Sequence, residues 1–206
     1  VDGSPERAAR LVTRFGRYGV RVLGTWVTVD NVNQFVIDSG LSGEVDLLSL
    51  DIDGNDFWVW RQLDACSPRM VILEFNAAFG PKRAVTVPYD AAFDRASFKT
   101  VSYQYFGASL SAFERLGRTK GYRLVLVEPR GVNAYFLRAD VGPNIPAASA
   151  AALHPNPTMD AQPLFSLLAD AKIPLVDLES PGEPEASAPV LTGDGTLVRW
   201  TNPTGS

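Results

Sequence analysis

The sequence predicts an α/β protein: a mostly parallel sheet that ends in an antiparallel hairpin, followed by a proline-rich C-terminal extension. From residue 1 to about residue 140, apolar runs alternate with segments of helical periodicity, which is the order of βαβ units. Two β-rich runs, Tyr122–Val127 and Asn133–Leu137, are joined by only five residues, among them Pro129 and Gly131. A connection this short requires an antiparallel pair, because a parallel pair needs a crossover of about a dozen residues.

The first helix is expected to begin after Ser4, which suits an N-cap, with Pro5 in its first turn. Ala8, Leu11 and Phe15 recur at helical spacing. This pattern predicts one apolar face, packed on the sheet.

The following elements are expected in the order strand, helix, strand, helix, strand, loop and helix. Their ranges are residues 20–27, 32–39, 45–50, 56–65, 69–75, 79–100 and 109–120. The run over 45–50 is mostly apolar, which predicts a buried strand. The last of these helices begins at Ser109 or Ser111, and Ser111 with Glu114 forms a candidate capping box.

Composition divides the chain into an α/β domain, residues 1–142, and a second part, residues 143–206. Ten of the fifteen prolines lie in the second part. There we expect a Pro/Ala-rich linker over 143–158 with His154 exposed in it, a helix over 160–172, and a hairpin of strands 190–192 and 196–200. This extension docks either on the main domain or on another protein.

Bulk composition excludes several classes of function. The chain has 206 residues and a net charge of −4, without a long basic run, which argues against a nucleic-acid binder. No apolar stretch reaches the roughly 20 residues that span a bilayer. The single Cys66 makes no internal disulfide and suits a reducing cytoplasm, and one Cys with one His argues against a zinc site.

Oxygen-bearing side chains follow two neighbouring predicted strands. Asp51 and Asp53 alternate after the predicted strand 45–50 and so point to the same side. Glu74 and Asn76 share a face at the end of the predicted strand 69–75. Ligands of open α/β sheets bind beyond the carboxyl ends of the strands, so this is the candidate site. The alternative is that residues 53–56 only form a turn and a helix cap.

Several of these segments resemble one protein family. Leu48–Trp58 resembles the fourth-strand motif of FkbM-like methyltransferases, and Val71–Asn76 resembles their fifth strand. Gly107–Leu110, Lys120–Tyr122 and Asn133–Phe136 are similar to later segments of that family. The resemblance covers about residues 1–140. It implies a Rossmann-like class I fold that binds S-adenosylmethionine (SAM), with a seven-stranded sheet ending in an antiparallel hairpin.

The resemblance also assigns roles to residues. It implies that Asp2, in the place of the acidic residue after the second strand, holds the ribose hydroxyls of SAM, and that Asp51 holds the amino end of the cofactor. Thr28 either lies near the adenine or belongs to a turn that ends in a helix cap at Asp30. Asp53 lies near the acceptor, and Glu74 is a candidate general base. The first strand of such folds, with its glycine-rich turn, has no counterpart before residue 1, so a longer parent chain is expected.

The residues at the two strand ends also resemble a metal site. Asp51, Asp53, Glu74 and Asn76 resemble the magnesium site of catechol-type methyltransferases. Hard cations such as Mg²⁺ prefer oxygen ligands, and a bound metal would lower the pKa of a coordinated hydroxyl. The site therefore predicts methyl transfer with or without Mg²⁺.

Three functions follow from these residues. The leading hypothesis is SAM-dependent O-methylation of a sugar, glycan or small natural product. The first alternative treats Asp51–Asp53 as the Asp-x-Asp metal motif of a nucleotide-sugar glycosyltransferase. The second is a truncated, non-catalytic methyltransferase-like binding module. A sheet that lacks a central strand exposes hydrogen-bonding edges, so we also expect self-association.

Overall fold

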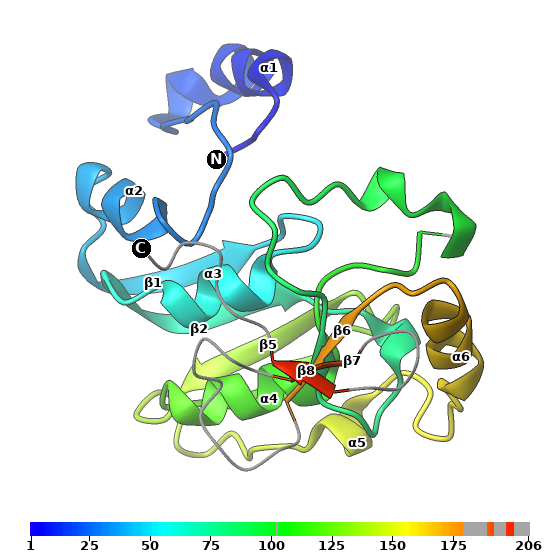
Figure 1. The fold of residues 1–206 in the computed structure, drawn as a ribbon. Coiled ribbons are helices and arrows are strands. Elements are labelled where there is room, and N and C mark those ends of the chain that lie inside the picture. The colour runs from blue at the N-terminus through cyan, green and yellow to red at the C-terminus, as the bar shows by residue number, and fades with distance from the viewer. Residues whose placement is uncertain (102, 179–188, 192–196, 200–206) are drawn as a thin grey trace.

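Two four-stranded sheets organise this protein in a computed structural model, which describes residues 1–101, 103–178, 189–191 and 197–199 (Figure 1). The first sheet has the order β1-β2-β5-β4. Its strands are β1 (Gly43–Leu50), β2 (Cys66–Glu74), β5 (Asn133–Arg138) and β4 (Tyr122–Val127). β1 and β2 are parallel, whereas β5 is antiparallel to both β2 and β4. The predicted antiparallel hairpin is therefore confirmed, and its second strand lies between β2 and β4.

The main core lies between this sheet and the helices α3 (Asp56–Gln62) and α4 (Leu110–Thr119). Trp60 of α3 is 1% exposed and contacts rings from three other elements. Its neighbours are Phe113 of α4, Tyr122 of β4 and Phe136 of β5, at ring-centroid distances of 5.2 to 6.2 Å. One aromatic side chain thus fixes both helices on the same face of the sheet.

The cap of α4 differs from the predicted capping box. The N-cap is Ser109, whose Oγ accepts a hydrogen bond from the Ala112 N–H. Ser111 instead donates to the Pro81 carbonyl, and Glu114 pairs with Arg118 one turn further along the helix.

The N-terminal segment corrects two expectations. Helix α1 (Pro5–Phe15) begins after the Ser4 cap as predicted, but Ala8 is its only buried residue, and Figure 1 shows the helix standing apart from the sheet. Residues 20–27 form no strand. They contribute one parallel bridge, between Asp2 and Gly24. Helix α2 (Val32–Asp38) follows as expected.

Strand β1 is the third correction, because it is an edge strand of its sheet rather than a buried one. Leu50 is its only buried residue, and Leu47 is 53% exposed. Within this apolar run only Leu48 and Leu50 pack on the core.

The second sheet joins the middle of the chain to its C-terminal part. Its strands, in the order β3-β6-β7-β8, are all antiparallel. They are β3 (Val85–Thr86), β6 (Leu175–Asp177), β7 (Pro189–Leu191) and β8 (Leu197–Arg199). The predicted C-terminal hairpin is confirmed as the pairing of β7 with β8, and its expected turn, residues 193–195, lies outside the described residues.

The region predicted as a linker is folded onto the domain. It contains the short helix α5 (Ala150–Leu153), and helix α6 (Gln162–Asp170) follows it with Leu164 and Leu168 buried. His154 is 3% exposed, so its predicted exposure is wrong. The ring nitrogens of His154 lie 3.0 Å from the Ala77 carbonyl oxygen and 2.8 Å from that of Asn156.

None of the helices in the described residues combines the length and the apolar character that crossing a membrane requires.

Candidate functional site

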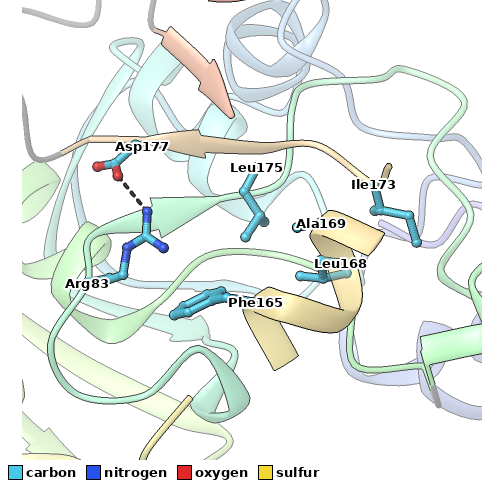
Figure 2. Close-up of a pocket in the computed structure, with 7 residues that line it drawn as sticks. All are labelled: Arg83, Phe165, Leu168, Ala169, Ile173, Leu175 and Asp177. Carbon is cyan, nitrogen blue, oxygen red and sulfur yellow. Dashed lines mark hydrogen bonds and ion pairs between the residues drawn. The ribbon is translucent and has the colours of Figure 1, made fainter. Parts of the chain in front are cut away.

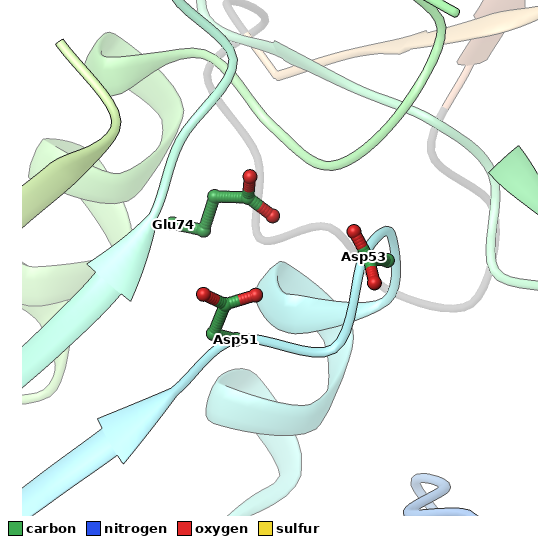
Figure 3. A group of neighbouring side chains, drawn as sticks. All are labelled: Asp51, Asp53 and Glu74. Atoms are coloured by element: carbon green, nitrogen blue, oxygen red, sulfur yellow. The ribbon is translucent and has the colours of Figure 1, made fainter. Parts of the chain in front are cut away.

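Parallel pairing of β1 with β2 brings three carboxylates together. Leu50 lies opposite Leu73 in the register, so the next residues, Asp51 after β1 and Glu74 at the end of β2, lie side by side. Asp53 joins them from the turn after β1 (Figure 3). One oxygen from each side chain lies within 4.8 Å of the others. We call Asp51, Asp53 and Glu74 the acid cluster; the sequence predicted this grouping.

The turn after β1 has a fixed shape that sets the position of Asp53. Asp53 has φ of 60°, in the left-handed region that Asp tolerates better than most residues. A Cβ on Gly54 would lie 2.3 Å from the Phe93 ring, so a larger residue there would require the ring to move. The buried Asp56 carboxylate accepts hydrogen bonds from the N–H groups of Ile52 and Gly54, both 3.0 Å long. Asp56 therefore holds the turn, which agrees with the structural interpretation of this residue.

Burial and mutual repulsion raise the pKa values of the carboxyl groups. Burial, followed by the charges of Asp51, Asp56 and Asp53, raises the pKa of Glu74 to about 7, against a smaller opposing effect of Arg95. Burial and the neighbouring Asp53 also raise the pKa of Asp51. Burial raises the pKa of Asp56 to about 7, although its hydrogen bonds to backbone N–H groups oppose the shift. Near neutral pH the Glu74 carboxyl group can therefore take up and release a proton.

Arg95 also belongs to the site, although the sequence analysis did not predict it. Its Nη1 lies 3.5 Å from Asp53 Oδ1 and 3.8 Å from Glu74 Oε1. The guanidinium carbon lies 3.6 Å from the centroid of the Phe106 ring, and Nε donates to the Tyr103 carbonyl. Residue 95 lies in the predicted loop over 79–100, where no periodicity indicates which side chain points inward. Only the position of this loop beside the strand ends indicated that it could contribute a residue to the site.

A cleft of about 170 Å³ separates the N-terminal segment from the turn after β1. Asp2, Gly3 and Trp26 line one side, and Asp51 and Asn55 line the other. Asp2 Oδ1 accepts a hydrogen bond of 2.8 Å from the Ser4 N–H, which orients its carboxylate. Two of the predicted cofactor-binding residues, Asp2 and Asp51, thus face one cavity.

Thr28 lies outside the lining of this cleft. Its N–H donates to Asn31 Oδ1 over 2.7 Å, and its carbonyl accepts from the Val32 N–H. These bonds place Thr28 in the turn that starts α2, while Thr25, Trp26 and Val27 face the cleft instead. The predicted role of Thr28 near an adenine therefore gains no support from its contacts.

The Asn76 side chain forms hydrogen bonds to the backbone of neighbouring segments. Its side chain is 2% exposed, and Nδ2 donates to the carbonyls of Gln104 and Phe106, at 2.7 and 3.0 Å. Its Oδ1, the atom that would bind a metal, accepts from the Ala78 N–H at 3.0 Å. Since these bonds engage both ends of the amide, we leave Asn76 out of the metal site.

A second cavity lies between α6, β6 and Arg83. Arg83 and Asp177, 2.7 Å apart, and the Phe165 ring border it (Figure 2). Its volume is about 20 Å³, which is room for about one water molecule. This cavity is too small for a substrate.

Comparison of the chain with protein-family models, curated proteins and solved structures found no match.

Proposed function

We propose that this protein is a SAM-dependent methyltransferase of the Rossmann-like class I type that methylates a hydroxyl group of a sugar, glycan or small natural product. The observation that carries the proposal is the cleft with Asp2 on one side and Asp51 on the other, next to the acid cluster. Asp51, Asp53 and Glu74 lie within the segments that resemble FkbM-like methyltransferases, Leu48–Trp58 and Val71–Asn76. The parallel β1–β2 pair and the antiparallel β5–β4 hairpin support this proposal, and the sheet has four strands among the described residues where the motifs imply seven.

The residues lining the cleft suit such a cofactor. A carboxylate accepts hydrogen bonds from vicinal hydroxyls or from an ammonium group, which are the tasks proposed for Asp2 and Asp51. The cofactor supplies an activated methyl group, so the chain must align the acceptor and take its proton. Glu74 suits the second task, because its pKa of about 7 lets it accept a proton near neutral pH. Asp53 is proposed to contact the acceptor.

The acid cluster also fits Mg²⁺. Glu74 Oε2 is buried without a hydrogen-bond partner among the described residues, and Mg²⁺ prefers carboxylate oxygens. Asp51, Asp53 and Glu74 would hold the ion, and the ion would lower the pKa of an acceptor hydroxyl. The same set of oxygens keeps the Asp-x-Asp glycosyltransferase as the second candidate.

We also propose that the protein acts in the cytoplasm. The single cysteine suits the cytoplasm, and burial raises the pKa of its thiol, which makes Cys66 a poor nucleophile. The acidic net charge suits a small-molecule or glycan acceptor rather than nucleic acid.

Calorimetric titration with SAM and S-adenosylhomocysteine, with and without Mg²⁺, tests the proposal. We expect micromolar binding that weakens in Asp2→Asn and Asp51→Asn. Asp46→Asn is the matched control, because the Asp46 side chain is 92% exposed and lies outside the residues that line the cleft. Binding of a nucleotide sugar with Mn²⁺, and of no SAM, would establish the glycosyltransferase instead. A folded sample that binds neither ligand would refute both enzymes and support the non-catalytic module.

A further inference from the structure

Asn55 carries a buried oxygen atom without a partner. The residue is 8% exposed and directly precedes α3, where an Asn side chain usually accepts a hydrogen bond from the first turn of the helix. Its Oδ1 makes no such bond and no other one among the described residues. The great majority of buried polar side-chain atoms in proteins are hydrogen-bonded, so this exception requires an explanation.

The orientation of the Asn55 amide is fixed by its other end. Nδ2 donates to the Asp90 carbonyl over 2.8 Å. A carbonyl oxygen only accepts hydrogen bonds, so rotating the amide by 180° would set oxygen against oxygen and lose this bond. The Asp90 carbonyl therefore keeps Oδ1 in its unpaired position.

Asn55 lines the cleft together with Asp51 and Asp2. We propose that Asn55 is a ligand-binding residue, whose Oδ1 accepts a hydrogen bond from an N–H donor of the molecule that occupies this cleft. The inference rests on the proposed function, under which the ligand is SAM or its demethylated product. That ligand offers N–H donors at two places, the ammonium of its amino-acid part and the amino group of its adenine.

Binding measurements on two variants separate ligand binding from a structural role. Asn55→Leu keeps the approximate shape but removes the acceptor, whereas Asn55→Asp keeps an acceptor oxygen and loses only the donor to the Asp90 carbonyl. Both variants lose the bond to Asp90, so a structural role would weaken both. A ligand role weakens binding only in Asn55→Leu.

We would titrate the 206-residue chain and both variants with S-adenosylhomocysteine and with 5′-methylthioadenosine, which lacks the amino-acid part. For S-adenosylhomocysteine we expect Asn55→Leu to bind about ten-fold more weakly, the usual effect of losing one hydrogen bond, and Asn55→Asp to stay within about three-fold of the native chain. A loss confined to S-adenosylhomocysteine identifies the ammonium as the donor. A loss for both probes identifies the adenosine part.

Thermal unfolding checks that each variant is folded, and Asn55→Ala replaces Asn55→Leu if the latter does not fold. Equal losses in the Leu and Asp variants, or no loss in Asn55→Leu, would overturn this inference and leave the proposed function standing. A native chain that binds neither probe would overturn the proposed function and this inference with it.

Discussion

Replacing Glu74 by Gln should make the folded protein more stable at alkaline pH. Burial raises the pKa of Glu74 from 4.5 to about 7, so between these values the native state holds a proton that the unfolded state has released. Stability therefore falls as the pH rises through this window. The shift corresponds to about 3 kcal/mol at about 1.36 kcal/mol per pH unit. The side chain is 11% exposed and Arg95 Nη1 lies 3.8 Å from Oε1, so we reduce the expected effect to about 2 kcal/mol.

Urea denaturation of the native chain and Glu74→Gln at pH 4.5 and pH 8 measures this effect. At pH 4.5, near the unfolded-state pKa, the two free energies of unfolding should differ little, because the native Glu74 is protonated and as neutral as Gln. At pH 8 the variant should be more stable by about 2 kcal/mol. Asp56 titrates in the same range in both proteins, so only the difference between them reports on Glu74. A difference that does not change with pH would refute the burial argument.

Four further changes test other parts of the structure. Arg95→Ala removes the guanidinium beside the acid cluster and should tighten Mn²⁺ binding about ten-fold in a titration followed by electron paramagnetic resonance; unchanged affinity would mean that Arg95 and the metal do not compete. Gly54→Ala places a Cβ 2.3 Å from the Phe93 ring and should lower the free energy of unfolding by about 2 kcal/mol in urea titrations, so a neutral result would show that the ring moves freely. His154→Ala should cost about 2 kcal/mol by the same measurement, because it leaves a cavity and breaks buried hydrogen bonds; a solvent-exposed ring would lose almost nothing. Leu47→Lys on the exposed edge strand should reduce the self-association expected of this chain in analytical ultracentrifugation, and an unchanged sedimentation profile would place any association elsewhere.

Local signals predicted those elements whose ends carry turn or cap residues. The hairpin of β4 and β5 followed from a short connection containing Pro129 and Gly131, and α1 followed from the Ser4 cap. The failures concern tertiary packing. Apolar residues of α1 and β1 predict burial, but periodicity does not tell whether a neighbouring element is there to cover them, and the structure leaves both largely exposed.

The candidate site was predictable to the extent that it depends on strand ends. Asp51, Asp53 and Glu74 lie at the carboxyl ends of two strands that pair in parallel, so their proximity is a consequence of topology. Arg95 reaches the acid cluster from a single 3-10 turn, Arg95–Ser97, and His154 is buried although it lies in a segment whose proline and alanine content indicated a linker. Contacts that depend on the path of a loop leave no periodic trace in the sequence.

The pairing of Leu50 with Leu73 limits how this protein can change in evolution. A single-residue insertion or deletion within β1 or β2 would shift one strand against the other and turn one carboxylate to the opposite face of the sheet. The turn and α3 between the two strands are equally constrained, since Asp56 holds the turn and Trp60 packs in the core. Homologues that retain this chemistry should therefore show no gaps within the two strands, the turn or α3.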